Sequence, residues 1–264
     1  MVATSPSKAQ PGIGSYILSD GPAGFLLSWV AGFVDVSAFI ILFGIFTAHV
    51  TGNIALAGYS FVYSDEESVV THLAMLPVFM ITVAGTSMLA RYARRKQWPV
   101  FAILLTAEAV ALSIFLIVGV SLTPSLVLDV QEEYIFPIGM TGVVAMAIQN
   151  ALMKEAKGTF KSYIPTTVMT GNTTQLTIDL VQVVISRFFS PATDEAAARA
   201  AAESKERMGR MFPVIVGFAL GSLAATYFVL ISESWWSLII PALIIAFMAI
   251  VAFAEHARLT HESD

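Results

Sequence analysis

Six apolar stretches of about 20 residues each constrain the fold of this chain more than any other feature of the sequence. A helix of about 20 apolar residues is long enough to cross the hydrocarbon core of a bilayer. The whole chain is 56% hydrophobic and 12% charged, whereas soluble domains carry about 25% charged residues. The sequence therefore predicts an all-α integral membrane protein with six transmembrane helices in a lipid bilayer. The predicted spans are 24–46, 70–91, 98–120, 134–153, 210–231 and 235–255.

A Thr-Gly-Asn tripeptide occurs twice, each time after an apolar stretch and near the start of a shorter or more polar segment. The segments are about 50–63, which is short for a span, and 166–187, which is long enough but polar. Thr and Asn favour helix starts, and Gly permits a sharp bend of the backbone. We therefore expect a re-entrant or broken-helix segment at each copy.

Positive charge decides between the ways of threading the chain. If the six apolar stretches cross and both polar segments enter and leave on one side, every Lys and Arg falls on the same face. By the positive-inside rule both termini are then cytoplasmic. We predict a plasma-membrane protein, in the inner membrane of a Gram-negative cell, with a cytoplasmic arm over 1–22 and a cytoplasmic tail over 256–264. The connections on the opposite face contain only acidic charged residues: Asp65, Glu66, Glu67, Asp129, Glu132, Glu133 and Glu233.

The two halves of the chain are related in sequence. Met75-Leu76-Pro77-Val78 matches Met211-Phe212-Pro213-Val214, and each half has one span, one Thr-Gly-Asn segment and two more spans. Three crossings in each half give the halves opposite orientations, a pattern common in secondary transporters. We therefore predict two inverted three-span repeats, over 23–121 and 134–255, with a cytoplasmic helical insertion at about 190–208.

Four ordered motifs carry a resemblance to a known family. They are Gly32-Phe33-Val34-Asp35, Ala48-His49-Val50-Thr51-Gly52-Asn53, Gln149-Asn150-Ala151 and Thr167-Val168-Met169-Thr170-Gly171-Asn172. Together they resemble the YoaK-like family of bacterial and fungal membrane proteins, over nearly the whole chain. The resemblance implies a six-span plasma-membrane protein and supplies no established substrate or reaction.

Ionisable groups within apolar segments are costly and are functional candidates. Asp35 is a proton-binding or cation-binding carboxylate, or a protonated acid bonded to a neighbouring helix. His49 suits a proton relay or pH sensor, or caps the following helix. Glu108 is a second proton carrier or a packing acid. Asp179 shares a helix face with Gln175. That face lines a wet cavity or forms a structural polar cluster. We take Asp35, His49, Glu108 and Asp179 as the candidates for proton coupling.

The two Thr-Gly-Asn segments are the candidate substrate site. If they approach from opposite faces, their helix N-termini meet near the midplane and favour an anionic or carbonyl-bearing ligand. The alternative is two helix caps with no ligand. Asn150 is the neutral counterpart of Asp35 in the second half. The candidate substrate-binding residues are Thr51, Gly52, Asn53, Asn150, Thr170, Gly171, Asn172 and Gln175.

These features predict a transporter of a small solute or ion, coupled to protons, rather than an enzyme. The sequence has no metal-binding, phosphate-loop or dinucleotide motif, so we expect no metal, no cofactor and no nucleic acid partner. Six spans are few for a transporter, and we expect a homodimer to complete the pathway. The alternative is a non-transporting membrane sensor or scaffold that acts through its cytoplasmic 187–210 region.

Overall fold

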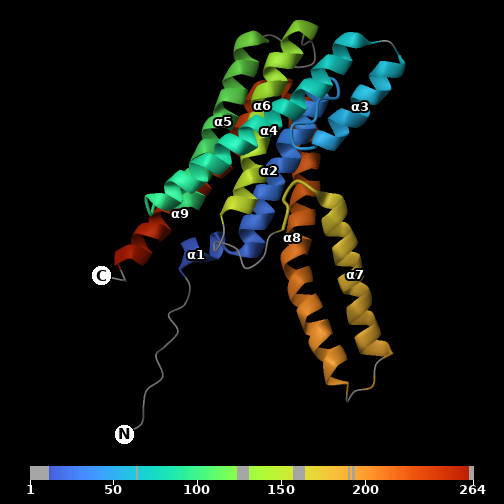
Figure 1. Ribbon diagram of the computed structural model, residues 1–264, viewed down its shortest axis with the longest axis vertical. Helices are drawn as coiled ribbons and strands as arrows, with labels where there is room; N and C mark the ends of the chain where they lie inside the picture. Colours follow the sequence, from blue (N-terminus) through green and yellow to red (C-terminus); the bar gives the residue numbers. More distant parts are fainter. Residues whose placement is uncertain are drawn as a thin grey trace.

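The computed structural model describes residues 12–63, 65–123, 131–156, 164–189, 191 and 194–261. Every regular element in these ranges is a helix, which confirms the all-α prediction (Figure 1). In chain order the elements are α1 (Ile13–Ile17), α2 (Asp20–Ile41), α3 (Val50–Val62), α4 (Glu66–Arg95), α5 (Val100–Leu122), α6 (Glu132–Glu155), α7 (Met169–Phe188), α8 (Glu195–Ser232), the 3-10 helix η1 (Trp235–Leu238) and α9 (Ile239–His261).

Six of these helices are long and apolar enough to cross a membrane, which confirms the predicted number of candidate spans. They are α2, α4, α5, α6, α8 and the continuous stretch of η1 and α9. The short helix α3 is apolar but has only 13 residues, and α7 is not apolar enough to be among the six. Each Thr-Gly-Asn copy lies at the start of one of these two remaining helices.

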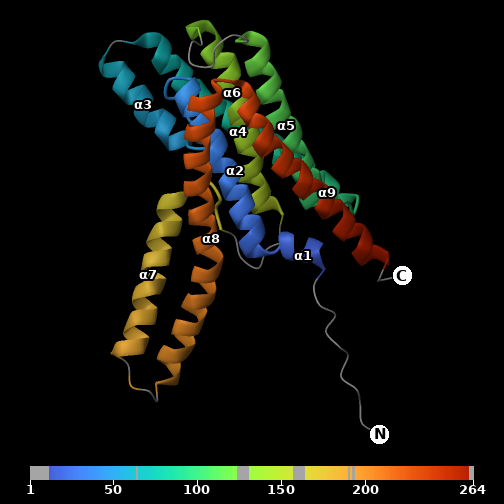
Figure 2. The ribbon, with the colours of Figure 1, turned by 180° about the vertical axis from the view of Figure 1, so that it is seen from behind.

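Several helix boundaries differ from those expected by a few residues, and two differences change how a span begins or ends. The first span ends at Ile41, because the chain turns sharply at Phe43 and Gly44, both with positive φ. The predicted insertion at 190–208 and the following span form one uninterrupted helix, α8, of 38 residues. At 1.5 Å per residue α8 is about 57 Å long, nearly twice the thickness of a hydrocarbon core. Its first part projects beyond the rest of the bundle beside α7 (Figures 1 and 2).

Glycines bring α2 and α8 into contact as a parallel pair. A Cβ atom built at Gly32 would lie 2.3 Å from the carbonyl oxygen of Phe218, and one at Gly221 would lie 2.1 Å from that of Trp29. Gly217 meets the α2 backbone in the same way. Small residues allow such close approach of helices in membranes, so the backbones themselves form this contact.

A second parallel pair joins α4 to α6. Met75 packs on Gly139 near the start of both helices, and Ser87 donates to the Glu155 carboxylate at 2.5 Å near the end of α6. Arg94 also bonds Glu155. The first long helix of each sequence half thus runs parallel to, and packs along, the third helix of the other half. Helix α5 packs against α6 and α9 and completes the main apolar core.

Candidate functional site

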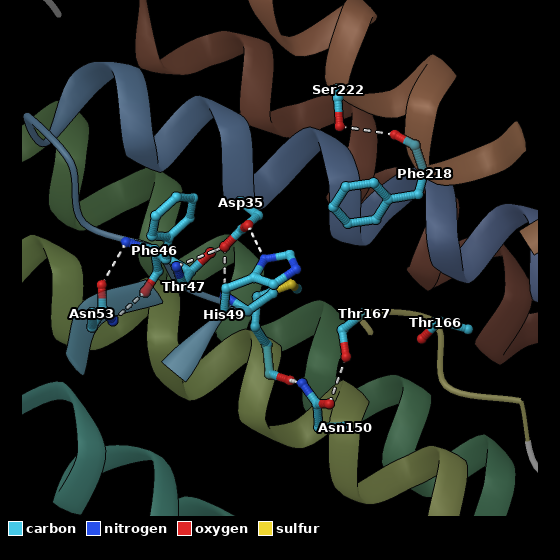
Figure 3. A network of polar contacts seen from close by, with 12 residues as sticks. Asp35, Phe46, Thr47, His49, Asn53, Asn150, Thr166, Thr167, Phe218 and Ser222 are labelled. Atoms are coloured by element: carbon cyan, nitrogen blue, oxygen red, sulfur yellow. Dashed lines mark hydrogen bonds and ion pairs between the residues drawn. The ribbon is translucent and has the colours of Figure 1, made fainter. Parts of the chain in front are cut away.

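The centre of the candidate site is the carboxylate of Asp35, on the buried face of α2. Asp35 is 1% exposed. Its Oδ1 accepts from the backbone N–H groups of Thr47 at 2.8 Å and Ala48 at 2.6 Å, and its Oδ2 contacts His49 Nδ1 at 2.5 Å (Figure 3). The chain after α2 therefore folds back along the helix that it has just left. Asp35 holds the turn that leads into α3.

His49 is the accessible member of this pair. About 32% of its side chain is exposed, against 2% for Asp35. The edges of two aromatic rings meet the imidazole, Phe46 from the turn and Phe218 from α8, at centroid distances of 5.8 and 5.7 Å. His49 precedes α3, but its side chain makes no capping hydrogen bond. The geometry thus links a buried carboxylate to a partly open imidazole that can exchange a proton with it.

The first Thr-Gly-Asn copy also holds this turn, through hydrogen bonds between Asn53 and the backbone of Phe46. Asn53 accepts from the backbone N–H of Phe46 at 2.9 Å and donates to its carbonyl at 2.7 Å. The Phe46 ring covers Gly52, where an added Cβ would lie 2.6 Å from the ring. Asn53 is therefore used to clamp the turn, and it does not cap the helix as Thr-Gly-Asn chemistry alone suggests.

The second copy repeats this local geometry. Asn172 donates to the carbonyl of Pro165 at 2.7 Å, again seven residues earlier in the chain. The residues before the two helices also have similar backbone angles, with φ −104° and ψ 79° at His49 and φ −108° and ψ 84° at Val168. Proline has no N–H, so Asn172 lacks the second backbone bond that Asn53 makes.

This difference predicts unequal costs for the two Asn→Ala variants. Asn53→Ala removes two hydrogen bonds to a turn, and Asn172→Ala removes one. A typical hydrogen bond contributes about 1 kcal/mol net, so we expect Asn53→Ala to destabilise the protein by about 1 kcal/mol more. Thermal unfolding of the two purified variants in the same detergent measures this difference. Equal losses of stability would contradict the assigned role of Asn53.

Asn150 on α6 is placed like Asp35 on α2. Its Oδ1 accepts from the Thr167 hydroxyl at 2.7 Å, and Thr167 directly precedes Val168, where the second turn ends. Its Nδ2 donates to the carbonyl of Met146 on its own helix. In each half a polar side chain of the first long helix thus bonds the turn before the Thr-Gly-Asn helix, with a carboxylate in one half and an amide in the other.

Each turn also packs on the first long helix of the opposite half. Thr47 of the first turn lies against Gly142 of α6, where an added Cβ would be 2.6 Å from its methyl group. Ser28 of α2 donates to the carbonyl of Thr166 in the second turn at 3.1 Å. Gln149 of α6 donates to the carbonyl of Leu27 on α2 at 2.7 Å and to the hydroxyl of Thr166 at 2.9 Å, so it joins α2 to that turn. The two turns are therefore anchored around α2 and α6, and Figure 3 shows both in one view.

Other predicted site residues lie apart from this network. Thr51, Thr170 and Gly171 are exposed, and no heavy atom lies within 4 Å of a Cβ built at Gly171. Glu108 is fully buried in α5, and neither of its carboxylate oxygens has a hydrogen-bond partner. Their roles in substrate binding and proton coupling stay predictions.

Asp179 faces α8, where Arg207 is its partner. The guanidinium donates to both carboxylate oxygens, at 2.6 Å from Nη2 and 3.2 Å from Nε, and Nη2 also donates to Ser204. The hydrogen bond from Arg207 holds the pKa of the Asp179 carboxyl below its usual range, and a side-chain bond from Gln175 lowers it further. The sequence left a wet cavity and a structural polar cluster open for Asp179, and it did not identify Arg207 as the partner, because the Arg residues entered the argument only as a topology signal.

The Asp179–Arg207 pair predicts how the contact between α7 and α8 depends on pH. The folded-state pKa of Asp179 is below the unfolded value of about 3.9, so the pair stabilises the contact above that pH. The contribution is lost as the pH falls through the folded-state pKa. We expect amide protection factors in α7 to fall in acid, and Arg207→Gln to lower them at neutral pH. Arg199→Gln, at an exposed pair with Glu195, should leave them unchanged; equal protection in both variants would contradict this role.

Comparison with known proteins assigns the chain to a family but does not identify an activity. The profile of one family, described as "Protein of unknown function (DUF1275)", matches residues 23–251. This range contains both Thr-Gly-Asn copies and agrees with the resemblance to the YoaK-like family. The comparisons with curated proteins and with solved structures found no match.

Proposed function

Because this chain belongs to the DUF1275 family, whose description names no activity, we propose its function from the geometry of the site. We propose that it is a proton-coupled transporter of a small solute in the plasma membrane, with both termini in the cytoplasm. The central site lies between two inverted halves, around the turns that precede α3 and α7.

The bond between Asp35 and His49 carries this proposal. An ionisable group in an apolar span is expensive to keep and marks ion or proton pathways. Asp35 is buried, and the same carboxylate that meets the His49 ring also holds two backbone N–H groups of the turn. Gain or loss of a proton by this pair changes the charge that holds the turn. Proton binding is thereby coupled to the position of the turn and of α3.

The arrangement of the helices supports two bodies that move against each other, each combining helices of one half with the first long helix of the other. Helix α2 packs along α8 and α6 along α4, so each half contributes its first helix to the other. Transporters with inverted repeats place their sites at the repeat interface, next to interrupted helices. The turns at 42–49 and 164–168 are such interruptions, and each lies on the first long helix of the opposite half, at Gly142 of α6 and Ser28 of α2.

Transport of an unidentified solute is tested with proteoliposomes that are loaded with a cell extract. Dilution into a labelled extract at an imposed pH gradient, followed by mass spectrometry of the vesicle contents, reports any solute that is exchanged or accumulated. We expect Asp35→Asn and His49→Asn to abolish the pH-dependent part. Glu233→Gln, an exposed acid at the end of α8, is the matched control. Uptake that is the same in Asp35→Asn and wild type would remove the pair from the mechanism.

The projecting α7–α8 hairpin favours a second candidate, a sensor or scaffold. Leu180, Val184 and Phe188 of α7 are exposed on a part of the molecule that extends beyond the bundle. Complementation of a deletion strain separates the two functions. A transporter requires Asp35 and tolerates Ser at these three positions. A scaffold requires the three apolar side chains and tolerates Asp35→Asn.

A further inference from the structure

A hollow of about 410 Å³ opens at the end of the bundle away from both termini. It lies between the turn that follows α2 and the first turns of α4. Its floor is apolar and buried, formed by Leu42 and Ile45, and its rim carries the ring of Phe43. A volume of this size suits a small organic molecule.

The polar groups in this hollow favour a cation. Asp65 and Glu67 at the start of α4 line it, and no Lys or Arg does so among the described residues. His72, one turn further along α4, also lines the hollow. It is 5% exposed, and its Nδ1 has no hydrogen-bond partner. Burying a polar atom without a partner is unfavourable, and a hydrogen-bond donor on a ligand would supply that partner.

A bare metal ion does not fit this set of side chains. No group of three or more His, Cys, Asp or Glu side chains among the described residues is placed to hold one. An ammonium group on an apolar body does fit. Its charge meets Asp65 and Glu67, its N–H can donate to His72, and its body lies on Leu42 and Ile45. The Phe43 ring adds an aromatic face, which attracts cations. We propose that this hollow is a binding site for an organic ammonium ion.

The hollow lies close to the central site, because Leu42 and Ile45 belong to the turn that connects Asp35 to His49. Leu42 is seven residues beyond Asp35, about 10 Å along the helix axis, and Ile45 is four residues before His49. Leu42, Ile45 and Met75 pack around Gly139 of α6 and close the floor. If the protein is the transporter proposed above, the hollow is an entry chamber for a cationic amine; binding itself does not depend on transport.

Calorimetric titration of the full chain in lipid nanodiscs tests the site, with phenethylammonium as the probe and 3-phenylpropionate as its anionic counterpart. We expect saturable binding of the amine alone. Asp65→Asn combined with Glu67→Gln should weaken it about tenfold, as expected for the loss of two charges near a bound cation. Asn remains a good N-cap, so the Asp65 cap to Ser68 survives. Glu66→Gln, the neighbouring acid that does not line the hollow, is the matched control.

Three outcomes would overturn the site: no binding of the amine by the wild type, equal binding by the double variant, or equal binding of the anion. Wild-type amine binding and proteoliposome transport, measured on the same preparation, separate this proposal from the transport proposal. Saturable amine binding together with pH-dependent transport supports both. Binding with no transport by any form supports the hollow and removes the transporter.

Discussion

Gly221→Ala is expected to separate α2 from α8 and to destabilise the protein by about 3 kcal/mol, the upper end of the usual cost of overpacking. The added Cβ would lie 2.1 Å from the carbonyl oxygen of Trp29 and 2.8 Å from its carbon. These are backbone atoms, which cannot rotate away as a side chain can. The helices must therefore move apart, and Phe218 on the same face of α8 then loses its place against His49.

Gly85→Ala is the matched control, because it makes the same change in a span where no heavy atom lies within 4 Å. Alanine is favoured over glycine in helices by about 0.5–1 kcal/mol, so this variant should be neutral or more stable. Thermal unfolding in one detergent, followed by size-exclusion chromatography, measures both. Similar melting temperatures for the two variants would contradict a backbone contact between α2 and α8.

Asp35→Ala is expected to have the second large effect, a loss of about 2–6 kcal/mol, since each of two buried donors left unsatisfied costs about 1–3 kcal/mol. Those donors are the backbone N–H groups of Thr47 and Ala48, which are 1% and 7% exposed. Both lose their acceptor at once, and His49 loses its partner. The turn before α3 should detach from α2.

Asn150→Ala is the internal comparison for this variant. It occupies the corresponding position in the second half, but its Oδ1 accepts one side-chain hydroxyl, that of Thr167. Its Nδ2 also loses the bond to the Met146 carbonyl, so we expect a loss of about 1–2 kcal/mol, the usual contribution of two such bonds. Hydrogen exchange should show increased opening of 45–53 in Asp35→Ala and little change there in Asn150→Ala. Equal thermal stability of the two variants would show that the carboxylate does not hold the turn.

The sequence alone was sufficient for the features that depend on contiguous residues. The length of an apolar stretch is a local property, so six candidate spans and an all-helical fold followed from it. The Thr-Gly-Asn copies correctly located the starts of α3 and α7, because helix initiation depends on the few residues around it. The G-x-x-x-G spacing of Gly217 and Gly221 is typical of close helix contacts, but it does not say which helix they contact.

Only the tertiary structure decided what the polar side chains bind. Asp35 bonds backbone N–H groups, and Asn53 bonds the backbone of Phe46. Such partners exist at nearly every residue, so no side-chain pattern in the sequence marks them. Asp179 pairs with Arg207, 28 residues away, because α7 and α8 form a hairpin. The sequence determined which segments are helical and apolar, since that depends on neighbours in the chain. Packing determined the site, since its hydrogen bonds join groups that become neighbours only when the helices meet.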